Sequence, residues 1–325
     1  MSSTVNKIKQ KSYFRDRFKY LKNNLPAAAE HYHNTESFDT AFSKPGISGN
    51  KVALITGATS GIGKAFADEL ARRHYDLIIT GRRKEVIDCT ADELKRNHQV
   101  SVKVVIADFS IEEEVDQLLR IIEKEPNLEV LVNNAGYGTN KIFHNDDIDR
   151  QLEMLKVHVT TPVMLIHKVL PIMISRHKGT IINVSSMAAF FPTDNNIMYA
   201  STKSFFLNFS ESLSMEVKKY GIQLQCLCPG FTNTDFHMKK GMNEGPKMKS
   251  LLGWQEPSEV VRYSLHQLEN RKVLCVPGAM NRLIVALLPM VPRKLYYYLS
   301  DRLDHDTGTD TVKSDSRVHG KPQMI

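Results

Sequence analysis

Short apolar runs alternate with amphipathic stretches through the middle of this 325-residue chain. The apolar runs are rich in β-branched residues and predict seven strands, at residues 52–56, 76–80, 102–107, 129–132, 180–184, 223–227 and 273–276. Stretches with helical spacing lie between them, among them 65–73, 85–97 and 112–123. Strict alternation of strand and helix favours crossover connections. We therefore expect an α/β fold, a doubly wound parallel sheet with its ligand at the carboxyl ends of the strands.

The same pattern divides the chain into one domain with extensions at both ends. Residues 1–49 are polar and basic and end in a Pro- and Gly-containing linker, whereas residues 50–277 carry the strand–helix alternation. Residues 278–302 form an apolar extension, and residues 303–325 are a polar tail typical of disorder. The longest apolar run that we identify, 283–288, is interrupted by Pro289, so we expect no segment of the roughly 20 apolar residues that span a bilayer.

The positive charge of the chain is concentrated at its beginning. The formal net charge is +7, and residues 1–25 hold seven Lys and Arg side chains against one Asp, which supplies +6 of it. The rest of the chain is nearly neutral, so we expect no nucleic-acid partner. Phe14, Phe18, Leu21 and Leu25 follow helical spacing among these bases. An amphipathic helix on an anionic membrane, docking on the protein's own surface and organellar targeting are equally open explanations.

The four cysteines, Cys89, Cys226, Cys228 and Cys275, show no CxxC spacing, and no histidine pair completes a zinc pattern. We therefore expect no metal site. Cys226 and Cys228 alternate along an apolar run and are expected as buried thiols. With no secretory signal in view, we expect a cytoplasmic protein, with peripheral membrane association left open.

A glycine-rich turn, TGATSGIG at residues 56–63, follows the first predicted strand, and a helix is expected to begin near Lys64. Glycines let backbone N–H groups approach an anion closely, and the helix N-terminus adds a partial positive charge. A glycine-rich turn alone is a weak signal, but its position after the first strand strengthens it. The candidate cofactor-binding residues here are Gly57, Ser60, Gly61, Ile62 and Gly63.

Several motifs in order resemble the short-chain dehydrogenase/reductase family over about residues 50–235: TGATSGIG, NNAG at 133–136, YASTK at 199–203 and CPG at 228–230. The resemblance implies a Rossmann fold, a nicotinamide cofactor and hydride transfer between that cofactor and a carbonyl or alcohol. It also implies further cofactor-binding residues, namely Asp108, Asn133, Ala135, Tyr199, Lys203, Pro229, Gly230, Thr232 and Thr234.

The second predicted strand is followed by Arg82 and Arg83 and lacks an acidic residue at Gly81. An acid there would accept hydrogen bonds from a ribose 2′-hydroxyl, whereas an arginine neutralises a 2′-phosphate. We therefore expect NADP(H) rather than NAD(H), with Arg82 as the main partner of the phosphate and Arg83 assisting.

Tyr199 and Lys203 are four residues apart in a helical pattern, so the phenol and the ammonium lie on one face. A nearby cation lowers the pKa of a phenol toward the range useful for acid–base catalysis. The family serine lies thirteen residues before the tyrosine, which selects Ser186, with Ser185 as the alternative. Its hydroxyl would polarise the substrate carbonyl.

His158 stands where the family usually carries an asparagine that supports a proton relay. A histidine in an apolar helix is often a core residue, so a structural role and a relay role are both open; either way, we predict that His158→Asn retains activity. We include His158 among the candidate catalytic residues.

Residues 235–254 hold three methionines and other apolar residues, in the region that covers the substrate in the family. Met187, Phe190 and Phe191 would extend an apolar wall. We expect a hydrophobic substrate, such as a fatty acyl, steroid or retinoid-like molecule; filling of the core or of a homo-oligomer interface is the alternative. A non-catalytic NADP(H) sensor is the second functional class.

Overall fold

The computed structural model describes residues 50–139, 141–193, 196–234 and 253–297. The chain divides into two units, 1–285 and 286–325, each described here by itself. Predictions for residues 1–49, for most of 235–254 and for 303–325 therefore fall outside the described residues.

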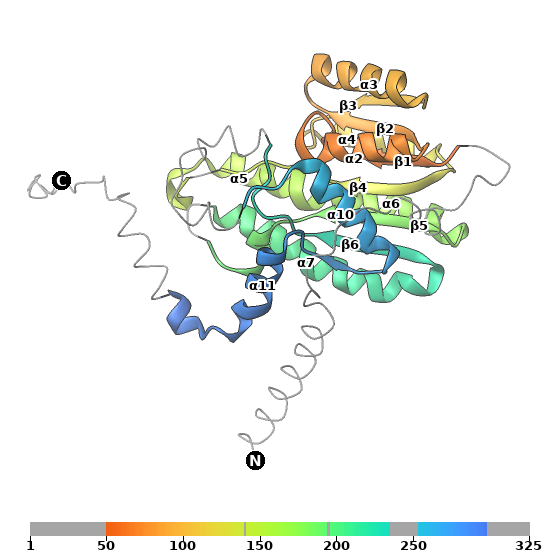
Figure 1. Cartoon of the computed structure of the whole chain (residues 1–325). Helices are drawn as coiled ribbons and strands as arrows, with labels where there is room; N and C mark the ends of the chain where they lie inside the picture. Colours follow the sequence, from red (N-terminus) through yellow and green to blue (C-terminus); the bar gives the residue numbers. More distant parts are fainter. Residues whose placement is uncertain (1–49, 140, 194–195, 235–252, 298–325) are drawn as a thin grey trace, which may run out of the picture. The chain divides into compact units, whose positions relative to one another are not determined.

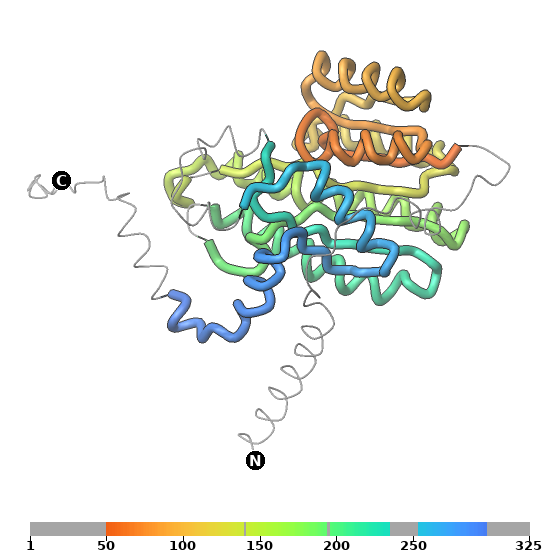
Figure 2. Tube along the Cα trace, in the orientation of Figure 1, coloured from red at the N-terminus to blue at the C-terminus, as the bar shows by residue number. Residues whose placement is uncertain are grey.

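A seven-stranded parallel sheet forms the first unit, with the strand order β3-β2-β1-β4-β5-β6-β7 (Figures 1 and 2). The strands are β1 Val52–Ile55, β2 Asp76–Gly81, β3 Val102–Ile106, β4 Leu128–Asn133, β5 Gly179–Val184, β6 Ile222–Leu227 and β7 Leu274–Cys275. The order reverses between β1 and β4, which is where a doubly wound sheet opens a crevice for a ligand. The predicted fold class is confirmed, and every predicted strand end lies within one residue of the observed one.

The helices of the described chain are α2 Gly61–Arg72, α3 Lys84–His98, α4 Glu112–Glu123, α5 Ile148–Leu155, α6 Thr161–Ser175, α7 Ile197–Val217, α10 Pro257–Glu269 and α11 Ala279–Leu287. Short turns are η1 Phe143–Asn145, the π-helical η2 Lys156–Thr160, η3 Met187–Phe190, η4 Lys218–Tyr220 and η5 Leu288–Met290. Helix α2 begins three residues before the predicted Lys64. The start near Lys64 was placed too late. Gly61 and Gly63 have poor helix propensity, so the sequence did not indicate the first turn, which tertiary packing stabilises.

Helices cover both faces of the sheet, and the burial of β1 shows how. Ala53 and Ile55 join a core cluster with residues of α2, α3 and α10. Val52 and Leu54 point to the other face and join a cluster with residues of α4, α6 and α7. Because successive side chains of a strand point to opposite faces, an all-apolar β1 requires a helix layer on each side. This sandwich holds the carboxyl ends of the strands rigidly at one edge of the sheet.

Elements α5, η2 and α6 form one helical run, Ile148–Ser175, which by length and composition alone is apolar enough to cross a membrane, since its most apolar 18-residue window has a mean hydropathy of 1.5. Our expectation that no segment reaches this length was wrong, because we counted uninterrupted runs and Lys156 and His158 break this one. In the fold, 44% of its most apolar window is buried. Leu165, Ile166 and Val169 are fully buried or nearly so and pack in the core. The run is therefore placed as a core helix.

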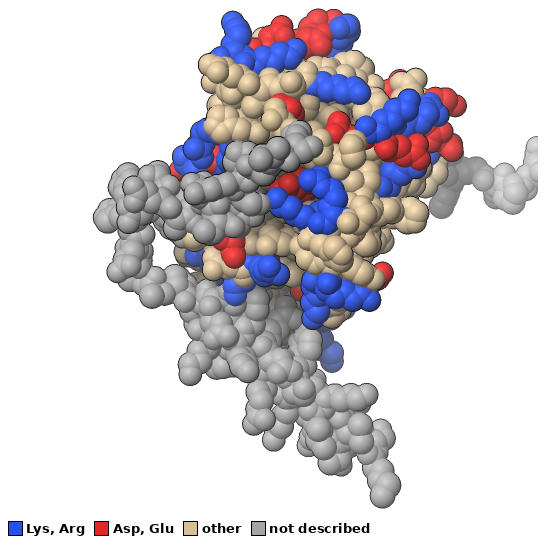
Figure 3. Space-filling model, turned by 90° about the vertical axis from the view of Figure 1, so that its right-hand side faces the viewer, with Lys and Arg blue, Asp and Glu red and all other residues tan. Residues whose placement is uncertain are grey.

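The described part of the second unit, residues 286–297, contains the end of α11, η5 and a helical turn at 293–297. Its apolar side chains are largely exposed, among them Leu287 and Met290. On the face of the molecule seen in Figure 3, Lys and Arg side chains lie interspersed with Asp and Glu.

Candidate active site

The glycine-rich turn between β1 and α2 is packed against the residues that follow β4. A Cβ atom on Gly63 would lie 2.3 Å from the Gly57 carbonyl oxygen and 2.4 Å from Nδ2 of Asn134. Nδ2 of Asn134 donates to the carbonyl oxygens of Thr56 and Gly57, at 3.0 and 3.1 Å. Gly57 also has a φ of +67°, a conformation that disfavours other residues. The turn is thus fixed by backbone packing that leaves no room for side chains.

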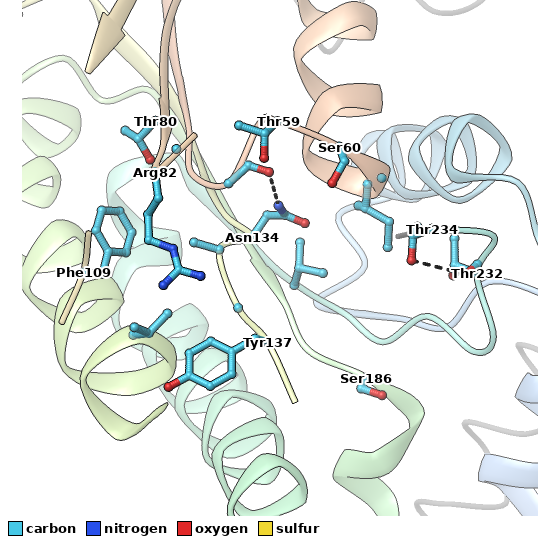
Figure 4. Close-up of a pocket in the computed structure, with 18 of the residues that line it drawn as sticks. Thr59, Ser60, Thr80, Arg82, Phe109, Asn134, Tyr137, Ser186, Thr232 and Thr234 are labelled. Carbon is cyan, nitrogen blue, oxygen red and sulfur yellow. Dashed lines mark hydrogen bonds between the residues drawn. The ribbon is translucent and has the colours of Figure 1, made fainter. Parts of the chain in front are cut away.

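An open cavity of about 370 Å³ runs along the carboxyl ends of the strands from this turn (Figure 4). Its lining includes the following predicted site residues: Gly57, Ser60, Gly61, Ile62, Arg82, Arg83, Asp108, Ala135, Ser186, Tyr199, Lys203, Pro229, Gly230, Thr232 and Thr234. The turn and the tyrosine, lysine and serine therefore share one crevice. Thr59, Phe109, Asn134 and Tyr137 also line it and were missed; the second asparagine of NNAG was a signal that could have identified Asn134.

Three predicted site residues do not line the crevice. Gly63 lies beneath the turn, and its absent side chain permits the packing. Asn133 is 5% exposed, and its Nδ2 donates to Oδ1 of Asn183 on the neighbouring strand at 2.9 Å, so it joins β4 to β5. His158 is 2% exposed, whereas its neighbour Val157 reaches the crevice. The structure therefore does not place these three residues where they could touch a cofactor or a substrate bound in the crevice.

The two arginines after β2 are oriented differently. Arg82 donates to Oδ2 of Asp108 at 3.3 Å and points into the crevice between Phe109 and Tyr137 (Figure 4). Arg83 donates to Oγ1 of Thr59 at 3.0 Å, on the glycine-rich turn. Burial alone raises the pKa of the Asp108 carboxyl, but hydrogen bonds from Ser110 and the Arg82 cation hold it below its ordinary value. Two cations and one carboxylate thus meet at this end of the crevice.

The other end of the crevice carries Ser186 and Tyr199. Ser186 caps η3 in an extended conformation, and its hydroxyl hydrogen-bonds the phenol of Tyr199. The hydroxyl of Ser185 donates instead to the Lys203 carbonyl at 2.8 Å and is 3% exposed, so it holds β5 to α7. The structure therefore brings Ser186, and not Ser185, to the phenol.

Lys203 is 6% exposed, and its Nζ donates to the Val184 carbonyl at 2.9 Å and lies 5.5 Å from the centre of the Tyr199 ring. Burial lowers the pKa of Lys203 to about 8. Burial also raises the pKa of Tyr199 above its ordinary 10, and the hydrogen bond from Ser186 offsets this only in part. We expected the lysine to lower the pKa of the tyrosine. That was wrong for this structure, because the ammonium is directed at a backbone carbonyl and burial outweighs it.

The loop after β6 closes the crevice. A Cβ on Gly230 would meet Nδ2 of Asn281 at 2.5 Å, and this nitrogen donates to the Pro277 carbonyl at 2.8 Å. Thr232 and Thr234 donate to backbone carbonyls within the same loop, at 3.1 and 3.4 Å. Asn281, which the motifs did not reveal, thus supports the loop from a position beyond the residues that carry the motifs.

The apolar residues expected along the substrate side are only partly described. Met187 and Phe190 pack against a small core cluster that contains Cys226 and Cys228. These two thiols are buried, as predicted, with their sulfur atoms 3.7 Å apart. Trp254 is 41% exposed, and its ring lies 5.7 Å from that of Phe231. Among the described residues, no group of three or more His, Cys, Asp or Glu side chains could hold a metal ion.

Comparison with known proteins agrees with this geometry. The family model described as short chain dehydrogenase matches residues 51–245. The very-long-chain 3-oxoacyl-CoA reductase of Anas platyrhynchos is 36% identical over 186 residues, 56% of this chain and 60% of the relative. The inactive hydroxysteroid dehydrogenase-like protein 1 of Homo sapiens is 31% identical over 216 residues, 66% of this chain and 63% of the relative. This chain therefore spans less than two thirds of the length of these relatives.

Solved structures show the same fold. A short-chain dehydrogenase from Sphingobium yanoikuyae in complex with NADPH has a TM-score of 0.65 at 24% identity, and the match covers 82% of this chain and all of that one. L-sorbose reductase from Gluconobacter frateurii, complexed with NADPH and L-sorbose, has a TM-score of 0.63 at 26% identity, over 71% of this chain and 95% of that one.

Proposed function

This chain belongs to the short-chain dehydrogenase family, and from that membership we propose that it is an NADP(H)-dependent oxidoreductase that transfers hydride between the nicotinamide and a carbonyl or secondary alcohol. The observation that carries the proposal is that Ser186, Tyr199 and Lys203 line the same crevice as the glycine-rich turn. The turn that would bind an anion and the side chains that would transfer a proton therefore line one cavity.

The turn fits a dinucleotide. Gly57 and Gly61 line a backbone cradle and Gly63 lies beneath it, and a Cβ atom at any of the three would strike neighbouring protein atoms and distort the turn. The N-terminus of α2, at Gly61, points its free N–H groups toward that cradle and favours a pyrophosphate there. When bound, the reduced cofactor would supply the hydride for a carbonyl, and the oxidised cofactor would accept it from an alcohol in the reverse direction.

The preference for NADP(H) is supported by Arg82 and Arg83 at the carboxyl end of β2. Arg82, whose guanidinium reaches into the crevice, is proposed as the main partner of the 2′-phosphate. Arg83, which contacts the hydroxyl of Thr59, assists it. A phosphate would compete with Asp108 for Arg82, whose exposed ion pair with that carboxylate is long, at 3.3 Å, and a phosphate can accept two parallel hydrogen bonds from a guanidinium.

Proton handling falls to Tyr199. In the direction of reduction, its phenol donates a proton to the carbonyl oxygen, and the hydroxyl of Ser186 hydrogen-bonds that oxygen as negative charge develops on it. Lys203 is still mainly protonated at neutral pH, since its pKa is about 8, and we assign its ammonium to hydrogen bonds with the nicotinamide ribose, which would hold the cofactor beside Tyr199. Pro229, Gly230, Thr232 and Thr234 hold the loop against the nicotinamide side of the crevice.

A hydrophobic substrate of the fatty acyl, steroid or retinoid class is the finer part of the proposal. The relative from Anas platyrhynchos is named for a very-long-chain 3-oxoacyl-CoA, and Trp254 and Phe231 place aromatic surface beside the loop after β6. Peripheral membrane contact and homo-oligomer formation stay predictions. Exposed apolar side chains on α7 and α11, such as Phe205 and Leu283, offer surface for either.

A non-catalytic sensor of the cofactor is the second candidate, and the name of the human relative contains the word inactive. The presence of Ser186 and Tyr199 in the same crevice favours catalysis, because a sensor has no chemical need for a proton donor there.

The test is NADPH oxidation with a panel of hydrophobic and small polar ketones and aldehydes, comparing wild type with Tyr199→Phe. We expect turnover of hydrophobic carbonyls by wild type and a loss of about 100-fold or more in the variant. Tyr220→Phe, which changes a tyrosine beyond the end of α7, is the matched control and should leave turnover unchanged. Turnover of only small polar carbonyls would refute the substrate class, and no turnover with intact NADPH binding would favour the sensor.

A further inference from the structure

His158 lies in η2, the π-helical turn between α5 and α6, and is buried. Single π-helical turns inside α-helices occur frequently at functional sites. Here the turn directs an imidazole inward, behind the crevice wall formed by Tyr137 and Val157. His158 therefore lies close to the candidate catalytic residues but does not line the crevice.

The protons around His158 can be assigned from its partners. The Tyr137 backbone N–H can only donate, and it lies 2.9 Å from Nε2, so Nε2 must accept. A neutral imidazole then carries its proton on Nδ1, which lies 3.0 Å from Oγ1 of Thr202. The Thr202 hydroxyl in turn donates to the Tyr199 carbonyl at 2.8 Å. One continuous chain of donors and acceptors thus runs from Tyr137 to Tyr199.

We propose that His158 is a positioning residue, held as the neutral Nδ1–H tautomer, which fixes Tyr137 in the cofactor crevice relative to the first turns of the helix that carries Tyr199. The inference rests on the proposed function, which gives those two tyrosines their roles. It replaces the proton-relay role that the sequence left open for His158, because the imidazole does not line the crevice.

Packing around the imidazole supports a fixed geometry. The rings of Tyr137 and Tyr199 meet it edge-on, with centroids 5.7 and 5.9 Å away. A Cβ on Gly136 would lie 2.9 Å from Nε2, so the loop backbone approaches the ring as closely as a glycine allows. A proton added to Nε2 would face the Tyr137 N–H, donor against donor, and break the chain at that point.

Glutamine and asparagine in place of His158 distinguish its contact with Tyr137 from its contact with Thr202. The side-chain amide of glutamine reaches about as far as Nε2, and that of asparagine about as far as Nδ1. His158→Gln can therefore keep an acceptor for Tyr137, and His158→Asn can keep a donor for Thr202. His158→Phe keeps the ring volume and loses both.

We expect His158→Asn to weaken NADPH binding about three- to tenfold, with kcat changed less than about threefold, because the Tyr137 N–H loses its acceptor. His158→Gln should show the reverse, with the Kd for NADPH unchanged and kcat about three- to tenfold lower. His158→Phe should show both effects. Val169→Ala, a buried truncation in α6, is the control: it should lower Tm and leave Kd and kcat unchanged.

The tautomer is tested without turnover, by ¹⁵N NMR of histidine-labelled full-length protein at neutral pH. The expected result is a proton on Nδ1 of His158, assigned by its loss in His158→Gln. A proton on Nε2, or on both nitrogens, would overturn the inference, as would variants whose affinity for NADPH and kcat both fall in step with Tm. If no carbonyl is turned over but the Nδ1–H tautomer and the effect on NADPH binding are found, the proposed reaction fails while the positioning role stands.

Discussion

The two ends of the crevice are built in different ways. At the cofactor end, Gly57, Gly61 and Gly63 form a turn whose shape depends on the absence of side chains. At the catalytic end, Lys203 and Tyr199 are buried side chains whose pKa values are displaced by the loss of water. One end works through backbone packing and the other through charge and protons.

The difference predicts how each end fails. A substitution in the turn should act sterically, on cofactor affinity, because the anion is held by backbone N–H groups. A substitution among the buried side chains should act on turnover, and it can even stabilise the protein, because burying an ionisable group costs free energy. Binding, turnover and stability should therefore separate cleanly between the two ends.

The largest effect is expected for Lys203→Met, which should lower kcat about 1000-fold because the proposed nicotinamide ribose contact beside the proton donor is lost. The same variant should be more stable than wild type at pH 7. The difference between an ordinary lysine pKa of 10.5 and about 8 in the fold corresponds to about 3 kcal/mol, less the lost hydrogen bond to Val184.

The sign of the pH dependence follows from linkage. Folding lowers the pKa of Lys203, so below about pH 8 the lysine is charged in both states and the folded state bears the full burial cost. That cost fades as pH rises from about 8 to 10.5, and so should the advantage of the variant. Chemical denaturation at pH 7 and pH 10 measures this; equal stability differences at the two values would contradict it.

Gly63→Ala should weaken NADPH binding about 100-fold, because its Cβ would overlap the Gly57 carbonyl and Nδ2 of Asn134 and push the turn open. Fluorescence titration with NADPH measures the loss. Asp68→Ala, on the exposed face of the same helix, is the control and should bind normally. Unchanged affinity in Gly63→Ala would mean that the turn does not hold the cofactor.

Arg82→Ala should lower the preference for NADPH over NADH about 10- to 100-fold, and Arg83→Ala less, because each removes a charge-assisted contact with the 2′-phosphate. The ratio of kcat/KM for the two cofactors is the measurement. Arg96→Ala, an exposed arginine on α3, should leave the ratio unchanged. A preference unaffected by Arg82→Ala would remove that assignment.

The smallest effect on turnover is expected at Ser185. Ser185→Ala loses the bond to the Lys203 carbonyl and should cost about 1 kcal/mol of stability with kcat lowered less than about threefold. Ser186→Ala is the matched comparison and should lower kcat about 100-fold, with a loss of about 1 kcal/mol of stability because η3 loses its cap. Equal losses of kcat in the two variants would contradict the assignment of the serine at 186.

The strands were predictable to within one residue because short apolar runs between polar stretches signal a sheet covered on both faces. Most residues of the crevice could be predicted, because they belong to motifs that follow the predicted strands along the chain. The start of α2 was not predictable from local signals, because Gly61 and Gly63 are poor helix formers held in place by Asn134 and the turn.

The features that escaped prediction depend on contacts between distant residues. The motifs predict Asn133 as a cofactor contact, but in the sheet its side-chain amide donates to Asn183. The displaced pKa values of Tyr199 and Lys203 depend on burial, which spacing along a helix does not reveal. The partners of His158, at 137 and 202, lie 21 and 44 residues away and become neighbours only through the fold.

The most direct test of the proposed chemistry follows the hydride itself, with a carbonyl that the panel shows to be turned over. NADPH carrying deuterium at both C4 positions should yield an alcohol with one deuterium on the carbinol carbon, and unlabelled NADPH in D₂O should place none there. An alcohol that takes its carbon-bound deuterium from D₂O, or that gains none from the labelled cofactor, would contradict hydride transfer in this crevice.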